Sequence, residues 1–151
     1  VMNYLINFSF ILSFFSYQSV YSQNIDYENW SLACEDCITT IDITRCYARQ
    51  RVIADSLMLD TYNKISVILD KGLEEAVLKL DEESIQWYEN SKSSLSKGQE
   101  YWKKMSKADL YFTYLCFEGG SMSTMITHHS ATSASYTRLK VLSGFLRNLN
   151  L

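Results

Sequence analysis

The sequence contains no proline and only five glycines in 151 residues. Proline and glycine are the residues that most disfavour a helix. Because both are missing or rare, most of this chain contains no helix-breaking residue. Gly119 and Gly120 are adjacent, which makes this pair the strongest chain reversal in the sequence. Alternating strand patterns are missing, whereas apolar residues recur every three or four positions. The sequence therefore predicts an all-α fold.

Positive charge is missing from the N-terminal region, where no Lys or Arg precedes Arg45. The apolar run over residues 4–15 has about 12 residues, fewer than the ~20 that a membrane-spanning helix needs. Small residues, Val20 and Ser22, precede Gln23 in the pattern that a signal peptidase cleaves. We therefore expect residues 1–22 to be a signal peptide and the mature chain to be periplasmic or extracellular, with no membrane span. The alternative is a buried N-terminal helix.

Histidine is scarce, and the net charge is only −3 with an isoelectric point near 5.4. The acidic balance argues against nucleic-acid binding and slightly favours a basic partner. His128 and His129 are adjacent, so on a helix their side chains point about 100° apart and do not converge on one zinc ion with Cys34 and Cys37. A redox role for the Cys-x-x-Cys pair requires an α/β pattern that is missing. We expect no metal and no cofactor.

Four cysteines are present: Cys34, Cys37, Cys46 and Cys116. An even number of cysteines in a small exported domain predicts two disulfides, and three pairings are possible. In an antiparallel bundle the start of the first helix and the end of the second lie at the same end. All four cysteines are therefore expected there.

Helical periodicity divides the chain into three main helices. The first is predicted over residues 40–71, with Gly72 as its break, and the second over residues 73–116. Its weak point is residues 90–98, which are rich in serine and can bend or break the helix. The third is expected over residues 135–148. These three helices predict an antiparallel bundle stapled by disulfides.

The remaining segments complete the predicted organisation. Residues 23–39 are polar and are expected to form an irregular arm. Residues 122–133 carry Ser, Thr and His and are expected to form a turn and an irregular start. The helical domain itself is predicted over residues 40–151.

A set of motifs follows one order along the chain: Cys34-x11-Cys46 with Thr39 and Thr40 between; Ala54-Asp55 followed by Tyr62; Leu95-x3-Gln99-x2-Trp102; Glu118-Gly119-Gly120-Ser121 with Met125; and Ser135-x2-Arg138-x3-Leu142. In this order they resemble the lysozyme inhibitor LprI-like N-terminal domain family, small helical exported domains of bacteria. The resemblance implies a Cys34–Cys46 disulfide, which leaves Cys37–Cys116 as the second bridge. It also implies structural roles for Asp55, Tyr62, Trp102 and Arg138.

Most of these residues also have a purely structural interpretation. Asp55 lies among apolar positions, and we expect it to pair with a neighbouring-helix arginine, such as Arg138, or to cap backbone donors. Trp102 and Tyr62 are expected to belong to the core. His128 and His129 are expected to be exposed. No convergent set of titratable residues indicates an enzyme.

Two functions remain. The resemblance implies a non-enzymatic exported protein that inhibits a lysozyme, with residues 118–121 (Glu118, Gly119, Gly120 and Ser121) as a rigid turn that enters the muramidase cleft and Gly120 at positive φ. The alternative is a structural or assembly module that binds another envelope protein through an exposed helix face. An exposed patch of Tyr or Trp favours the second function over the first.

Overall fold

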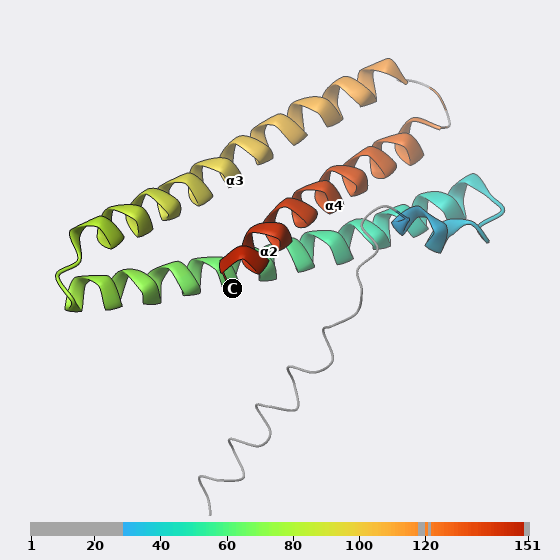
Figure 1. Ribbon diagram of the computed structural model, residues 1–151. Coiled ribbons are helices and arrows are strands. Elements are labelled where there is room, and N and C mark those ends of the chain that lie inside the picture. The colour runs from blue at the N-terminus through green and yellow to red at the C-terminus, as the bar shows by residue number, and fades with distance from the viewer. Residues whose placement is uncertain (1–28, 118–119, 121, 150–151) are drawn as a thin grey trace, which may run out of the picture.

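The computed structural model describes residues 29–117, 120 and 122–149. The expected signal peptide, residues 1–22, lies outside these residues, as do Glu118, Gly119 and Ser121. The described part contains a short 3₁₀ helix and three long α-helices, with no strand (Figure 1). Their bounds are η1 Trp30–Cys34, α2 Thr40–Leu78, α3 Glu82–Cys116 and α4 Ser123–Leu149.

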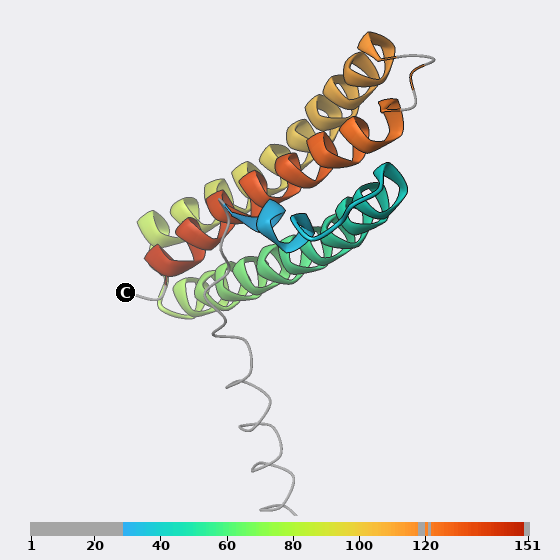
Figure 2. The ribbon, with the colours of Figure 1, turned by 90° about the vertical axis from the view of Figure 1, so that its right-hand side faces the viewer.

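The three long helices form an antiparallel bundle, which confirms the expected fold class. α2 and α3 make a long hairpin, and α4 returns along it (Figures 1 and 2). Contact between α4 and α2 is the most extensive in the bundle, while α3 touches each of them less. α4 stops short of the corner between α2 and α3, so at that end the hairpin consists of two helices alone (Figure 1).

The core lies where α4 crosses the middle of α2. One side of α2 contributes residues spaced by four, seven and four positions, which is the period of a single helix face. α4 contributes three residues spaced by three. All are buried: Ala54, Met58, Ile65, Leu69, Tyr136, Leu139 and Leu142.

The sequence predicts that the first helix ends at Gly72, but the helix continues to Leu78. Residues 73–78 are Leu, Glu, Glu, Ala, Val and Leu, most of which favour helices, and they outweigh one glycine. The break comes instead at residues 79–81. The backbone N–H of Leu80 donates to the carbonyl of Val77, and that of Asp81 donates to the carbonyl of Ala76. These two bonds form a Schellman motif, which ends the helix.

Two residues turn the chain from α2 into α3. Leu80 adopts a φ of 55°, the left-handed conformation that the Schellman motif requires and that glycine usually supplies. Asp81 is the N-cap of α3, since its carboxylate accepts from the backbone N–H of Ser84 at 3.1 Å and from the Ser84 hydroxyl at 2.6 Å. These bonds lower the pKa of Asp81. The sequence pattern missed this corner because it contains neither proline nor glycine.

Gly72 serves packing between helices rather than a turn. A Cβ built on Gly72 would lie 2.3 Å from the ring of Tyr88 on α3. Tyr88 is half-buried, packs against the core cluster and makes an edge-to-face contact with Trp87. The absence of a side chain at Gly72 therefore lets α3 approach α2 near the closed end of the hairpin.

We predict that Gly72→Ala lowers stability although alanine is the better helix former. Helix propensity alone would add up to ~1 kcal/mol, but the new methyl group displaces the Tyr88 ring, and such overpacking costs ~1–3 kcal/mol. Gly144 is the matched control, because nothing lies within 4 Å of its built Cβ. Gly144→Ala should raise the free energy of unfolding in urea. Equal stabilisation by both substitutions would show that Gly72 has no packing role.

The second helix is unbroken through residues 90–98. Its serine-rich segment gains contacts with the other helices: Lys92 pairs with Asp70 of α2 at 2.5 Å, and Leu95 packs against the core. Gly98 lies beside Arg138 of α4. Tertiary contacts thus compensate for the poor helix formers in this segment.

The third helix begins at Ser123, so the irregular start predicted for residues 122–133 is wrong. Ala131, Thr132 and Ser135 are buried in this segment. The Thr132 hydroxyl lies 2.7 Å from the carbonyl of His128 in its own helix and 3.0 Å from the carbonyl of Tyr47 on α2. The buried Thr132 hydroxyl thus has acceptors, and burial of this segment against α2 stabilises the helix.

Candidate functional site

The N-terminal end of the bundle carries one disulfide. Cys34 is bonded to Cys46, with Cα atoms 5.8 Å apart, which is the pair that the family resemblance implies. The second predicted bridge, Cys37–Cys116, is not formed, since both residues are free cysteines. Figures 1 and 2 show the reason: the N-terminal half of α4 lies between the start of α2 and the end of α3 and keeps the two apart.

An aromatic cluster docks the described part of the N-terminal arm on the bundle. The Trp30 ring stacks on Tyr136 at 5.6 Å between centroids and contacts Tyr47 and His129 at 5.6 and 5.2 Å. The Tyr136 hydroxyl donates to the side-chain oxygen of Gln50 at 3.0 Å, and burial raises the pKa of Tyr136. The periodicity of the sequence missed this cluster, because Trp30 lies in an arm with no helical pattern.

The sequence predicts that Asp55 pairs with Arg138, but the two residues do not pair in the structure. Its carboxylate accepts from the Ser135 hydroxyl at 2.5 Å and lies 3.6 Å from Arg51 Nε, one turn earlier on α2. Asp55 and Arg138 face different neighbours: Asp55 meets α4, whereas Arg138 reaches α3. Asp55 is nevertheless partnered, by a hydroxyl of α4 and by an arginine of its own helix.

Arg138 bonds instead to Gln99 of α3. Its Nε donates to Gln99 Oε1 at 3.0 Å, and Gln99 Nε2 lies 3.8 Å from Met58 Sδ. Burial lowers the pKa of Arg138. Gln99 is the one buried residue of α3. Arg138, Gln99 and Met58 thus connect the three long helices.

Tyr62 and Trp102 both contact the core. Each is half-buried and packs against the buried cluster formed by α2 and α4. These positions agree with the structural interpretation given above.

A groove runs between α3 and α4 in two adjoining sections. The first has a volume of about 440 Å³, with walls that include Trp87, Leu95, Leu142 and Phe145. The second, of about 510 Å³, is lined by Trp102, Met105 and the middle of α4. Arg138 and Val141 line both sections and mark where they meet. Sequence periodicity missed this groove because it depends on how far α3 and α4 stand apart.

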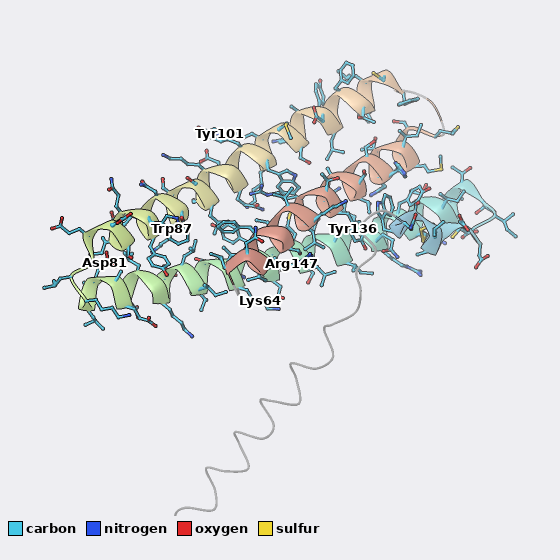
Figure 3. All side chains as sticks on the ribbon, viewed as in Figure 1. Lys64, Asp81, Trp87, Tyr101, Tyr136 and Arg147 are labelled. Carbon is cyan, nitrogen blue, oxygen red and sulfur yellow. A yellow bond between two sulfur atoms is a disulfide. The ribbon has the colours of Figure 1, made fainter. Side chains whose placement is uncertain are left out.

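The C-terminal half of α3 exposes apolar side chains. No residue of α3 beyond Gln99 is fully buried. Six large hydrophobic residues in this half and the C-cap Phe117 are between 43% and 69% exposed. Tyr101 extends from the outer side of α3 (Figure 3). We name these seven residues the aromatic segment: Tyr101, Met105, Tyr111, Phe112, Tyr114, Leu115 and Phe117.

Charged residues are interspersed along the aromatic segment, and most of them are lysines. Lys103, Lys104 and Lys107 lie within it, against Glu100 and Asp109. Lys104 pairs with Glu100 at 2.6 Å, which lowers the pKa of Glu100. The local balance is therefore basic, although the whole chain is acidic.

Of the proposed binding turn, residues 118–121, the structure describes only Gly120. The Gly120 N–H donates to the carbonyl of Phe117 at 3.1 Å. Its φ lies outside the left-handed region, so the positive φ predicted for Gly120 is wrong. A backbone hydrogen bond to Phe117 therefore holds Gly120 next to the end of α3. The φ angle at this position does not require glycine.

Among the described residues, no three or more His, Cys, Asp or Glu side chains are grouped so as to hold a metal ion. None of the described helices combines the length and the apolar character of a membrane span.

Comparisons with protein-family models, with curated proteins and with solved structures give no match for this chain. The resemblance to the LprI-like domain family therefore stays a prediction from the sequence.

Proposed function

We propose that this chain is a non-enzymatic exported binding module that engages a partner protein through the aromatic segment of α3. One observation carries the proposal: seven large hydrophobic side chains are exposed between Tyr101 and Phe117, along the C-terminal half of α3 and at its C-cap. Apolar surface patches on soluble proteins mark interaction sites. Tyr and Phe are also among the residues enriched at protein interfaces.

The charge of this surface favours a particular kind of partner. Lys103, Lys104 and Lys107 lie beside the aromatic residues, so an acidic partner surface is complementary and a basic one is repelled. A lysozyme is basic, and its approach to this face is disfavoured. The geometry thus supports the assembly-module function over lysozyme inhibition, which rests on the family resemblance and on the turn at residues 118–121.

The Cys34–Cys46 disulfide supports the exported location that we propose. Disulfides persist in oxidising compartments such as the periplasm and the extracellular space, and they are rare in the cytosol. The bridge ties η1 to the start of α2, which keeps this end of a small bundle rigid.

The test compares two charge-introducing substitutions on exposed apolar positions. Phe112→Asp places a carboxylate in the aromatic segment, and Val52→Asp places one on α2 at a residue that is equally exposed, 69% in each case. We expect Phe112→Asp to weaken binding of the purified partner at least tenfold, because hot-spot aromatic residues contribute 2 kcal/mol or more. Val52→Asp should leave the affinity unchanged, and circular dichroism should show both variants folded.

Muramidase inhibition provides the opposing outcome. Our proposal fails if three results are found together: the parent chain inhibits a lysozyme, Glu118→Lys abolishes that inhibition, and Phe112→Asp does not. The turn at residues 118–121 would then be the binding site. If sedimentation shows a dimer that Phe112→Asp dissociates, the partner is a second copy of this chain.

A further inference from the structure

The groove between α3 and α4 contains an arginine, Arg138, that pairs with no carboxylate among the described residues, although Asp109 also lines the second section. Arg138 lies where the two sections of the groove meet. Within the described part of the chain, its guanidinium makes no ion pair; its Nε donates to Gln99 Oε1. A guanidinium carries five N–H donors, so both Nη groups retain capacity for a ligand.

The guanidinium is held in place before any ligand arrives. Gln99 is only 8% exposed, and its amide is fixed between Arg138 on one side and Met58 on the other. Gly98 leaves room beside it, because Arg138 Nη2 lies 3.4 Å from the point where a Cβ would stand. A donor that is positioned in advance loses little conformational entropy on binding.

The first section of the groove suits an apolar ligand body. Its walls include Trp87, Leu95, Leu142 and Phe145, and its volume of about 440 Å³ is within the range of small-molecule sites. From Gly98, beside Arg138, back to Trp87 the helix advances eleven residues, or roughly 16 Å at 1.5 Å per residue. The groove thus places one cationic group at the end of an elongated apolar channel.

We propose that this groove binds a linear amphipathic carboxylate, with its carboxylate on the Nη groups of Arg138 and its chain along Trp87, Leu95, Leu142 and Phe145. The planar fork of an arginine matches two carboxylate oxygens, and such charge-assisted pairs are about twice as strong as neutral ones. The anion also supplies an ion-pair partner for Arg138, which has none among the described residues. The first section, which holds the chain of the ligand, shares no residue with the aromatic segment, whereas Met105 of that segment lines the second section.

Calorimetric titration with dodecanoate, kept below its micelle concentration, tests the proposal on the full chain. Arg138→Met keeps the apolar stem and removes the guanidinium. It should weaken dodecanoate binding at least tenfold, the effect of losing a hydrogen-bonded charge pair, and leave binding of the neutral dodecanol unchanged. Arg147→Met is the matched control: Arg147 lies on the same helix, is exposed and does not line the groove (Figure 3). Its affinity should stay within about twofold of the parent value.

A second variant keeps the site testable if Arg138→Met does not fold. Val141 lines both sections and is 57% exposed, so Val141→Trp fills the junction without disturbing the core. It should weaken dodecanoate and dodecanol alike, with the helical circular dichroism signal preserved.

Three results would overturn the proposal. The parent chain shows no saturable binding of dodecanoate; Arg138→Met binds it as tightly as Arg147→Met does; or the parent binds only anionic phospholipid vesicles, in an Arg138-dependent way. The last result would assign Arg138 to a membrane surface rather than to a free carboxylate.

Discussion

Leu139→Ala is expected to lower the free energy of unfolding by about 3–4 kcal/mol, the largest effect of any single substitution that we predict. Leu139 has no exposed surface and packs between α4 and α2, in the contact that holds the bundle together. Removing three carbon atoms there loses their burial and leaves a cavity that rigid helices do not fill by relaxing.

Val141→Ala provides the matched control for this substitution. Val141 lies two residues further along α4 and is 57% exposed, so truncation there should change stability by less than about 1 kcal/mol. Chemical denaturation followed by circular dichroism measures both variants. Similar losses in the two would mean that α4 is not anchored through the core face that contains Leu139.

Removal of the disulfide should have the second-largest effect. Cys34 and Cys46 are 12 positions apart in the sequence, and in the chain-entropy model a loop of this length stabilises the fold by about 3 kcal/mol. We expect this loss in the double variant Cys34→Ser and Cys46→Ser. It should also loosen η1, so the near-ultraviolet dichroism of Trp30, which stacks on Tyr136, should weaken.

The remaining two cysteines supply the control. Cys37 and Cys116 are unpaired, and Cys116 is exposed, so replacing both with serine should change stability by less than about 0.5 kcal/mol. Thiol titration of the unfolded parent chain should find two free thiols. A loss comparable to that of the first pair, together with no free thiol, would restore the Cys37–Cys116 bridge that the sequence predicts.

The sequence predicted helices well where the pattern depends on local chemistry. Three long helices and their antiparallel order follow from apolar residues that recur every three or four positions, and the N-cap at Thr39 begins α2 by accepting from the backbone N–H of Asp42. The ends of the helices were less predictable. Gly72 looks like a break but accommodates Tyr88, while the actual corner uses Leu80 in the conformation usually given to glycine.

Candidate sites were harder to predict than helices. Asp55 and Arg138 are oppositely charged, and we expected them to pair. Asp55 instead accepts a hydrogen bond from Ser135, and Arg138 donates one to Gln99. The rotation of each helix about its axis decides which side chains meet, and no single-chain pattern fixes that rotation. Exposure of the aromatic segment was equally hidden, because Tyr, Phe and Leu in a helical pattern predict burial.

Sequence alone determined the all-α class, the three helices and the cysteines whose number and spacing predict an exported, disulfide-linked protein, because these depend on neighbours along the chain. Tertiary structure decided which cysteines pair, which apolar side chains of α3 stay exposed and which arginine of the α3–α4 groove forms no ion pair. The physical reason is the placement of α4. Its N-terminal half lies between the start of α2 and the end of α3, so Cys116 is kept from Cys37.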